Sequence, residues 1–256
     1  MGSSRDRSAS RSGTVPIFEF DPDLLAGVSP QVTRRIAATR VPFMALKAGP
    51  WTPPTTEQAF AFMIMSGAVA RETRVPGERS LELLGPGDVV LSSPVDALGS
   101  VPSVALWEAL QPSEVALLDE RFEAQAVRAP WILVRLARRA SDRADRNLIQ
   151  MTIAGAHPVR RRVELLLWHL ADRWGIRKEG GVNLPIRLTQ RTLAALTATE
   201  RSTVCRVLIE LVEDGTLEHL AEKHLRLLGP PPSQQLIELA EERLSLERGA
   251  LADPDK

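Results

Sequence analysis

Residues 188–206 limit what this chain can fold into more than any other stretch. Apolar residues recur there at three- and four-residue spacing in two short segments, which predicts two helices joined by a tight turn. The expected apolar face consists of Leu193, Leu196, Val204, Val207, Leu208 and Leu211. The opposite face of the second segment carries Arg201, Ser202 and Arg206. A helix that presents arginine and hydroxyl groups near its N-terminus, with a packed helix behind it, suits the major groove of DNA.

The charge of the chain is balanced overall but not locally. The 256 residues hold 32 basic and 32 acidic side chains. From Arg187 to Arg206, however, four arginines stand against one glutamate, a net charge of +3. Residues 238–256 hold six acids against three bases, a net charge of −3. Positive charge around the two predicted helices is what attraction to a phosphate backbone requires, and that attraction weakens as salt is added.

Residues 188–228 resemble the winged helix-turn-helix of the bacterial catabolite-activator/fumarate-nitrate regulator (CRP/FNR) family. The similarity has no gap and runs through Leu188, Thr189, Leu193, Ala194, the turn at 197–200, Arg201, Thr203, Val204, Arg206, Val207, Leu208, Leu211, Gly215 and Leu217. In the family the second helix typically opens Ser-Arg-Glu-Thr-Val-Gly-Arg, and its two arginines and its glutamate reach base edges. The resemblance therefore implies base reading by Arg201, Ser202 and Arg206. We also expect contacts to DNA phosphates from residues of the first motif helix, the second motif helix and the hairpin behind them, namely Thr189, Gln190, Arg191, Thr203, Lys223 and Arg226.

Three departures from the family pattern bear on this expectation. Ser202 replaces the glutamate, so a carboxylate that could accept from cytosine N4 is missing. Ala198 stands where the family often has glycine, a position that a positive φ would make unfavourable for alanine. Glu200 stands at the usual N-cap serine, and Thr199 beside it could cap the helix instead. Family-like DNA binding is implied, but the family's best-known operator is not.

The rest of the chain predicts an α+β fold. Short apolar or alternating runs separated by Gly- and Pro-containing turns favour an antiparallel jelly roll or barrel, as in the family's cyclic-nucleotide-binding-like domain. The expected strands are Val41–Leu46, Ala59–Met65, Val69–Val75, Ser80–Leu84 and Val89–Leu91, and the expected short helices are Pro22–Leu25, Ser29–Ala38 and Pro112–Ala126. Leu84–Asp88 resembles the family's Pro-Gly-Asp turn. The expected boundaries are a disordered tail at 1–14, a β-barrel sensor-like domain at 15–128, a dimerisation helix at 129–156, a winged helix-turn-helix at 157–229 and an extension at 230–256.

A long helix is predicted from Pro130 to about Ala154, because the stretch between them holds neither proline nor glycine. One stripe of this helix consists of Leu133, Leu136, Ala140, Ala144, Leu148 and Met151. Its three- and four-residue spacing is typical of a seam between helices, and the resemblance implies that the helix pairs with its twin in a homodimer. The alternative is an amphipathic helix packed on its own β-domain. A further helix is expected from Pro158 to Trp174, with Arg160, Arg161 and Arg162 facing solvent or phosphates in its first turn.

Several kinds of site are missing from the sequence. Cyclic-nucleotide binders of the family place an arginine after the Pro-Gly-Asp turn, whereas residues 88–120 contain no lysine or arginine. A bound cyclic phosphate would lack a positive partner there, so we expect no cAMP binding at the family's usual site. All four histidines lie at 157 or beyond, outside the β-region, which argues against a metal or haem site in it. With no nucleophile elbow, phosphate loop or dinucleotide motif either, we expect no enzyme and no cofactor.

Other functions stay open at this stage. The aromatic residues Phe43, Trp51, Phe60, Phe62 and Trp107 could line a pocket for an apolar effector, although such residues more often form a core. Cys205 is the single cysteine, so it forms no intrachain disulfide, and its oxidation could disturb DNA docking. The winged helix could also bind protein instead of DNA.

The partners expected from the sequence are double-stranded DNA and a second copy of the chain. RNA polymerase is a candidate partner, and the identity of an effector stays open. No apolar run approaches the roughly 20 residues that span a bilayer, and residues 1–13 lack the apolar core of a secretory signal. A cytoplasmic protein is therefore expected. Operator sequence, and whether the protein activates or represses, are not readable from the residues.

Overall fold

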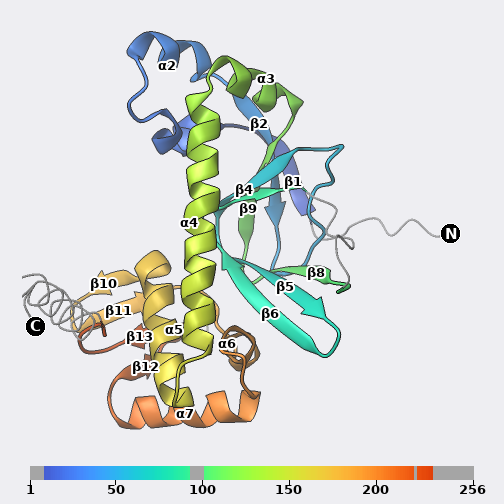
Figure 1. Ribbon diagram of the computed structural model, residues 1–256. Helices are drawn as coiled ribbons and strands as arrows, with labels where there is room; N and C mark the ends of the chain where they lie inside the picture. The colour runs from blue at the N-terminus through green and yellow to red at the C-terminus, as the bar shows by residue number, and fades with distance from the viewer. Residues whose placement is uncertain (1–8, 93–100, 222–223, 233–256) are drawn as a thin grey trace, which may run out of the picture.

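The structure is a computed structural model that describes residues 9–92, 101–221 and 224–232 (Figure 1). An N-terminal β-domain lies beside the upper part of one long helix, and a C-terminal helical domain with a small sheet lies at the other end of that helix (Figure 1). Lys223 and nearly all of the expected extension at 230–256 lie outside the described residues.

Two antiparallel sheets form the β-domain. The first has the order β1-β2-β9-β4-β7 and the second the order β3-β8-β5-β6. The strands of the first sheet are β1 (Ala9–Pro16), β2 (Arg40–Leu46), β9 (Ser113–Leu118), β4 (Ala61–Ser66) and β7 (Val89–Leu91). Those of the second are β3 (Gly49–Pro50), β8 (Val104–Ala109), β5 (Val69–Val75) and β6 (Glu78–Leu84). The strands pair in antiparallel fashion throughout, as the short alternating runs predicted.

Helices cover one side of the first sheet. They are α1 (Ile17–Phe20), the 3-10 helix η1 (Pro22–Leu25), α2 (Pro30–Ile36) and α3 (Glu120–Arg128). Phe122 of α3 is fully buried in the same apolar cluster as Met63 and Leu118 of the sheet. The N-cap Asp119 accepts a hydrogen bond from the amide of Phe122 at 3.1 Å, which fixes where α3 begins.

Two segments contradict the expectation from sequence, and strand β8 lies where no strand was expected. Strand β1 begins at Ala9, inside the segment expected to be a disordered tail, because backbone pairing with β2 does not require apolar side chains. Residues 113–118, expected as the start of a helix, form β9, and α3 begins only at Glu120. Strand β9 lies between β2 and β4, so both of its edges find hydrogen-bonding neighbours that sequence pattern does not reveal.

The space between the two sheets is filled by aromatic rings. The ring centroids of Trp51 and Phe62 lie 5.6 Å apart, those of Phe62 and Trp107 5.5 Å and those of Trp51 and Trp107 6.0 Å. All three residues are buried in one apolar cluster with Ile64 and Leu84. Phe43 and Phe60 pack elsewhere, against the cluster under α3. The five aromatic residues therefore do not line one pocket, and three of them are core.

The C-terminal part begins with two long helices, α4 (Trp131–Ala154) and α5 (Val159–Trp174). A small sheet of order β10-β11-β13-β12 and two further helices complete the domain. Their bounds are β10 (Ile176–Lys178), β11 (Gly181–Leu184), α6 (Gln190–Leu196), α7 (Arg201–Glu213), β12 (Leu217–His219) and β13 (Leu225–Leu227). No helix among the described residues is long and apolar enough to cross a membrane.

The core of the C-terminal domain extends onto the β-domain. Val163, Leu166 and Leu170 of α5 share one apolar cluster with the predicted apolar face of α6 and α7. Ala70 of β5 and Leu81 and Leu83 of β6 belong to the same cluster. The C-terminal domain therefore packs on an apolar surface formed by the β5–β6 hairpin.

Candidate nucleic-acid interface

Helix α7 has one buried and one exposed face. Val204, Val207, Leu208 and Leu211 are buried, as the spacing predicted. Arg201, Ser202 and Arg206 are exposed on the other side, and the side chain of Arg206 is 72% exposed. Figure 1 shows α7 at the end of the molecule farthest from the first β-sheet. The three side chains are thus open to solvent at one end of the molecule.

The two exposed arginines make only weak contacts. Arg206 Nε lies 4.0 Å from Glu210 Oε1, one turn along the same helix. Arg201 Nε donates to Gln190 Oε1 at 3.3 Å, and Gln190 Nε2 lies 3.4 Å from Cys205 Sγ. Exposed pairs of this kind contribute little free energy, so both guanidinium groups can exchange them for another acceptor. Gln190, expected at a phosphate, contacts Arg201 and Cys205 of α7 in the chain without DNA.

The other residues expected at phosphates are in different surroundings. Thr189 is the N-cap of α6, where its hydroxyl accepts from the amide of Thr192 at 3.1 Å. Thr189 and Arg191 line a cleft of about 450 Å³ whose opposite wall includes Glu72 and Glu108 of the β-domain. Thr203 is half-buried.

Arg226 lies on β13, in the β12–β13 hairpin that is the wing of the winged helix-turn-helix, and it is bound within its own sheet. Its Nε donates to Asn183 Oδ1 at 2.7 Å, and its Nη1 lies 3.1 Å from Glu218 Oε2. A guanidinium that is shared between β11 and β12 in this way is partly neutralised. The three residues expected to read bases therefore lie together on α7. The residues expected at phosphates lie in different places, namely at the N-cap of α6, in the cleft beside the β-domain and in the ion pair of the small sheet.

Arg162 is a site residue that sequence reasoning placed wrongly. It was expected to face solvent or phosphates, but it is buried, and it reaches the turn between α6 and α7. Its Nη1 donates to the carbonyl oxygens of Thr197 at 2.9 Å and Ala198 at 3.4 Å, and its Nε donates to Ala156 O at 3.1 Å. The sequence does carry a sign of this burial. Leu166 and Leu170 follow Arg162 by four and eight residues, so they lie on the same face of α5, and both are buried.

The turn itself has an unusual backbone. Ala198 has φ of +47°, in the left-handed region that favours glycine. Glu200 is the N-cap of α7 and makes no side-chain capping bond, so the alternative cap at Thr199 is not used. Thr197 is fully buried, and its hydroxyl donates to Leu193 O at 2.7 Å. The turn is therefore held by Arg162 and Thr197 and not by a capping side chain.

Most of the predicted stripe on α4 is open to solvent. Leu133, Leu148 and Met151 are 41%, 62% and 69% exposed. Ala140 and Ala144 between them are exposed too. Leu136 differs, because it faces the β-domain and is buried in the cluster under α3. Helix α4 thus binds its own β-domain along one face and leaves an apolar face largely open to solvent in this single chain.

Comparison with known proteins follows the same division of the chain. Residues 161–231 match the family model of the Crp-like helix-turn-helix domain. The C-terminal domain is a Crp-like helix-turn-helix domain. This match and the solved structures described next confirm the resemblance to CRP/FNR transcription regulators that residues 188–228 carry. Among curated proteins, none matches the sequence of this chain.

Solved CRP/FNR regulators share the fold of the whole molecule. A double mutant of CooA from Carboxydothermus hydrogenoformans is 20% identical, with 86% of this chain and 94% of that chain covered and a TM-score of 0.60. FixK2 from Bradyrhizobium japonicum is 19% identical, with 77% and 96% covered and a TM-score of 0.57. A CRP/FNR-family transcriptional regulator from Thermus thermophilus is 22% identical, with 78% and 98% covered and a TM-score of 0.52. The cyclic-nucleotide-binding-like β-domain and the α+β architecture are those of this group.

No cluster of three or more His, Cys, Asp or Glu side chains suited to a metal ion occurs in the part of the chain that the structure describes.

Proposed function

We propose that this chain is a sequence-specific DNA-binding transcription regulator that acts as a homodimer. The observation that carries the proposal is the exposed face of α7, where Arg201, Ser202 and Arg206 lie opposite a buried apolar face in a Crp-like domain. This arrangement presents two guanidinium groups on a rigid helix, as recognition in a major groove requires.

Each residue of α7 has a distinct part in the proposed recognition. Arg201 and Arg206 read bases, and a guanidinium can donate two hydrogen bonds to O6 and N7 of guanine. Ser202 adds a shorter and less selective contact. Thr189, Arg191 and Thr203 approach phosphates, which fixes the register of α7 on the duplex without reading sequence.

The proposed dimer forms along α4. Its exposed stripe of Leu133, Ala140, Ala144, Leu148 and Met151 runs for most of the helix and would be buried by a second copy. Leu136 is excluded from this interface because it is already buried on the β-domain. Two-fold symmetry along α4 would present two α7 helices to half-sites about 34 Å apart on an imperfect palindrome.

We also propose that the β-domain binds no cAMP at the family's usual site. Trp51, Phe62 and Trp107 fill the space between the sheets. Near α4, Arg71 and Arg143 are both paired with Glu82, at 3.8 Å and 2.6 Å. Calorimetric titration of the protein with cAMP should give no binding in the micromolar range. Micromolar affinity would show that this part of the proposal is wrong.

Selection of bound sites from a random DNA library tests the main proposal. The expected product is a set of sequences with two related half-sites whose centres lie about one helical turn apart. Protein bound to random duplex DNA should be displaced by modest salt, whereas protein bound to the selected duplex should be retained to higher salt. No enrichment of any sequence would favour the alternative in which the winged helix binds protein.

A further inference from the structure

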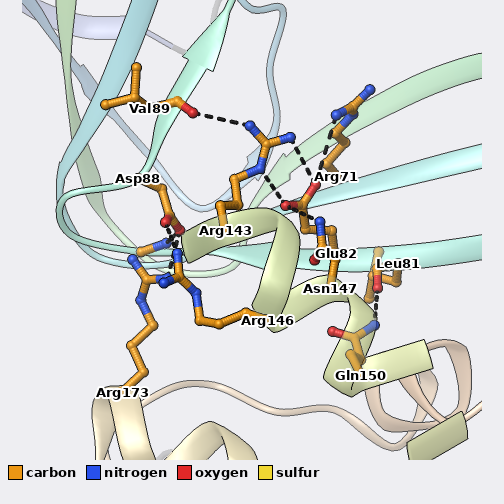
Figure 2. Close-up of polar contacts among 11 residues, drawn as sticks. Arg71, Leu81, Glu82, Asp88, Val89, Arg143, Arg146, Asn147, Gln150 and Arg173 are labelled. Atoms are coloured by element: carbon orange, nitrogen blue, oxygen red, sulfur yellow. Dashed lines mark hydrogen bonds and ion pairs between the residues drawn. The ribbon is translucent and has the colours of Figure 1, made fainter. Parts of the chain in front are cut away.

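The turn between β6 and β7, residues 84–89, is contacted by both α4 and α5 (Figure 2). Asp88 lies at its centre, and its side chain is only 2% exposed. Its Oδ2 accepts from the amide of Gly85 at 2.9 Å, which closes the turn. Arg146 of α4 pairs with Oδ1 of this carboxylate, and Arg173 of α5 approaches Oδ2 at 2.8 Å. One buried carboxylate therefore joins three parts of the molecule.

Contacts on the α5 side show close fit as well as charge. Arg173 Nη2 donates to Pro86 O at 2.9 Å, and its guanidinium lies over the ring of Trp174. A Cβ added to Gly85 would come within 2.6 Å of the Trp174 ring. Gly85 is thus required for this approach, since any side chain would displace the end of α5. The turn is therefore complementary in shape to the C-terminal end of α5.

Contacts on the α4 side continue for two turns of that helix (Figure 2). Glu82 accepts from Arg143 Nε at 2.6 Å and from Asn147 at 2.8 Å. Arg143 also donates to Val89 O at 3.0 Å, and Gln150 donates to Leu81 O at 2.6 Å. Helix α4 is therefore fixed to β6 and β7 independently of Asp88.

Asp88 adds a polar tie to α5, beside the apolar packing of α5 on the β5–β6 hairpin. Helix α4 ends at Ala154 and α5 begins at Val159, so only a four-residue link joins them along the chain. The charges on Arg146 and Arg173 would repel one another without the carboxylate between them. Removal of one member of such a buried group leaves the others without compensation, which is costly.

We propose that Asp88 is a positioning residue that fixes the angle between α4 and the DNA-binding domain, and so sets the half-site spacing that a dimer reads. The half-site part of this inference rests on the proposed function, while the fixed angle does not. Because α4 is the proposed dimer axis and α5 is built into the core of the DNA-binding domain, their angle sets how far apart two α7 helices lie.

The test uses Asp88→Asn and Arg173→Gln in the full chain. Asparagine retains an acceptor for the Gly85 amide and removes the charge, so the turn can still close. Arg173→Gln keeps the carboxylate of Asp88 and removes its ion pair with α5. This second variant keeps the proposal testable if Asp88→Asn does not fold. Arg177→Gln is the matched control, because Arg177 is an exposed arginine on the neighbouring β10.

The first readout needs no DNA. Spin labels are attached at Arg79→Cys on β6 and Glu213→Cys on α7 in a Cys205→Ser background, and labelled chains are diluted with unlabelled ones. Pulsed dipolar spectroscopy should give one narrow distance distribution for the otherwise unchanged chain and for Arg177→Gln. Asp88→Asn and Arg173→Gln should broaden it. A distribution that stays narrow in both variants overturns the proposal.

The second readout uses the selected operator with its half-sites moved apart or together by two base pairs. The otherwise unchanged protein should prefer its natural spacing, and both Asp88→Asn and Arg173→Gln should lose at least about fivefold of that preference. A broadened distance distribution with an unchanged spacing preference overturns the link to DNA. Broadening in the variants, with no sequence-specific binding by any form, supports the fixed angle and counts against the proposed function.

Discussion

Arg162 shows how a single buried side chain can hold the shape of a DNA-binding motif. Its guanidinium donates to the carbonyl oxygens of Ala156, in the link between α4 and α5, and of Thr197 and Ala198, in the turn between α6 and α7. Carbonyl groups in a buried turn require donors, and neighbouring residues of the turn provide few. The position of α7 relative to α6 therefore depends on a residue of α5.

Replacement of Arg162 by glutamine should lower the free energy of unfolding by about 2 kcal/mol, because a shorter side chain leaves turn carbonyls without a donor. The control is Arg160→Gln. Arg160 pairs at the surface with Glu164 and Asp214, so its loss should cost less than about 1 kcal/mol. Urea denaturation measures both. Equal effects of the two substitutions would show that Arg162 is not needed by the turn.

Ala198 gives a prediction of the opposite sign. Its φ of +47° is strained for alanine and relaxed for glycine. Ala198→Gly should therefore raise the free energy of unfolding by up to about 1 kcal/mol, after the entropy that glycine adds to the unfolded chain is subtracted. Ala195→Gly, inside α6 of the same domain, should instead lower it by about 1 kcal/mol. A loss of stability at both positions would contradict the strain at 198.

These two residues also mark the limit of sequence reasoning at this scale. The strain at Ala198 was foreseeable, because the family often has glycine at that turn. The burial of Arg162 was not expected, since three adjacent arginines in a first turn are usually solvated. Only the phase of Leu166 and Leu170 distinguishes Arg162 from its two neighbours. Which carbonyls it reaches depends on loops that no local pattern places.

At the scale of elements, the contact between α4 and α5 includes a titratable group. Burial lowers the pKa of His169 on α5, and the charge of Arg146 on α4 also lowers it, whereas the charge of Asp172 and a hydrogen bond to the backbone of Arg146 oppose these effects. The folded state therefore holds the proton less tightly than the unfolded state, in which the pKa is about 6.5. Stability that depends on neutral His169 is complete above that pH and is lost as the pH falls below it.

Denaturation measured at pH 7.5 and at pH 5.5 tests this sign. The otherwise unchanged protein should lose more stability between the two values than His169→Gln, because glutamine takes up no proton. Carboxyl groups titrate in both proteins and cancel in the comparison. Equal losses, or a larger loss in His169→Gln, would mean that the folded state does not disfavour the protonated ring.

Elements differed in how well the sequence predicted them. The expected strand at 41–46 is β2, and the expected helix after Ser29 is α2, because alternation and a proline at the first helical position are local signals. Strands β1, β8 and β9 were not among the expected strands. All three depend on pairing with strands far along the chain, and local composition carries little information about such pairing.

On the whole-molecule scale, the exposed face of α4 predicts self-association. Leu148→Glu should weaken dimer formation by tenfold or more, since each factor of ten corresponds to about 1.4 kcal/mol. Burial of a charge against a second α4 should cost at least that much. Val127→Glu is the control, because Val127 is 66% exposed and belongs to α3, not to the stripe on α4. Sedimentation velocity over a range of concentrations measures both.

If the otherwise unchanged protein were monomeric at all concentrations, the proposed homodimer would be contradicted. Equal weakening by Leu148→Glu and Val127→Glu would place the interface away from α4.

The architecture of the whole molecule was predictable because one motif of about forty residues carries a family resemblance. The orientation of its domains was not, since it depends on long-range contacts such as the apolar cluster on the β5–β6 hairpin and the ion pairs of Asp88.

The most direct test of the central claim compares Arg206→Ala with the otherwise unchanged protein on two DNA duplexes, the selected operator and a random sequence. Loss of Arg206 should cost about 1–3 kcal/mol on the operator and much less on random DNA, because a base contact carries sequence information and a phosphate contact does not. Arg177→Ala should leave the ratio of the two affinities unchanged. Equal losses on both duplexes, or no loss on either, would contradict base reading by α7.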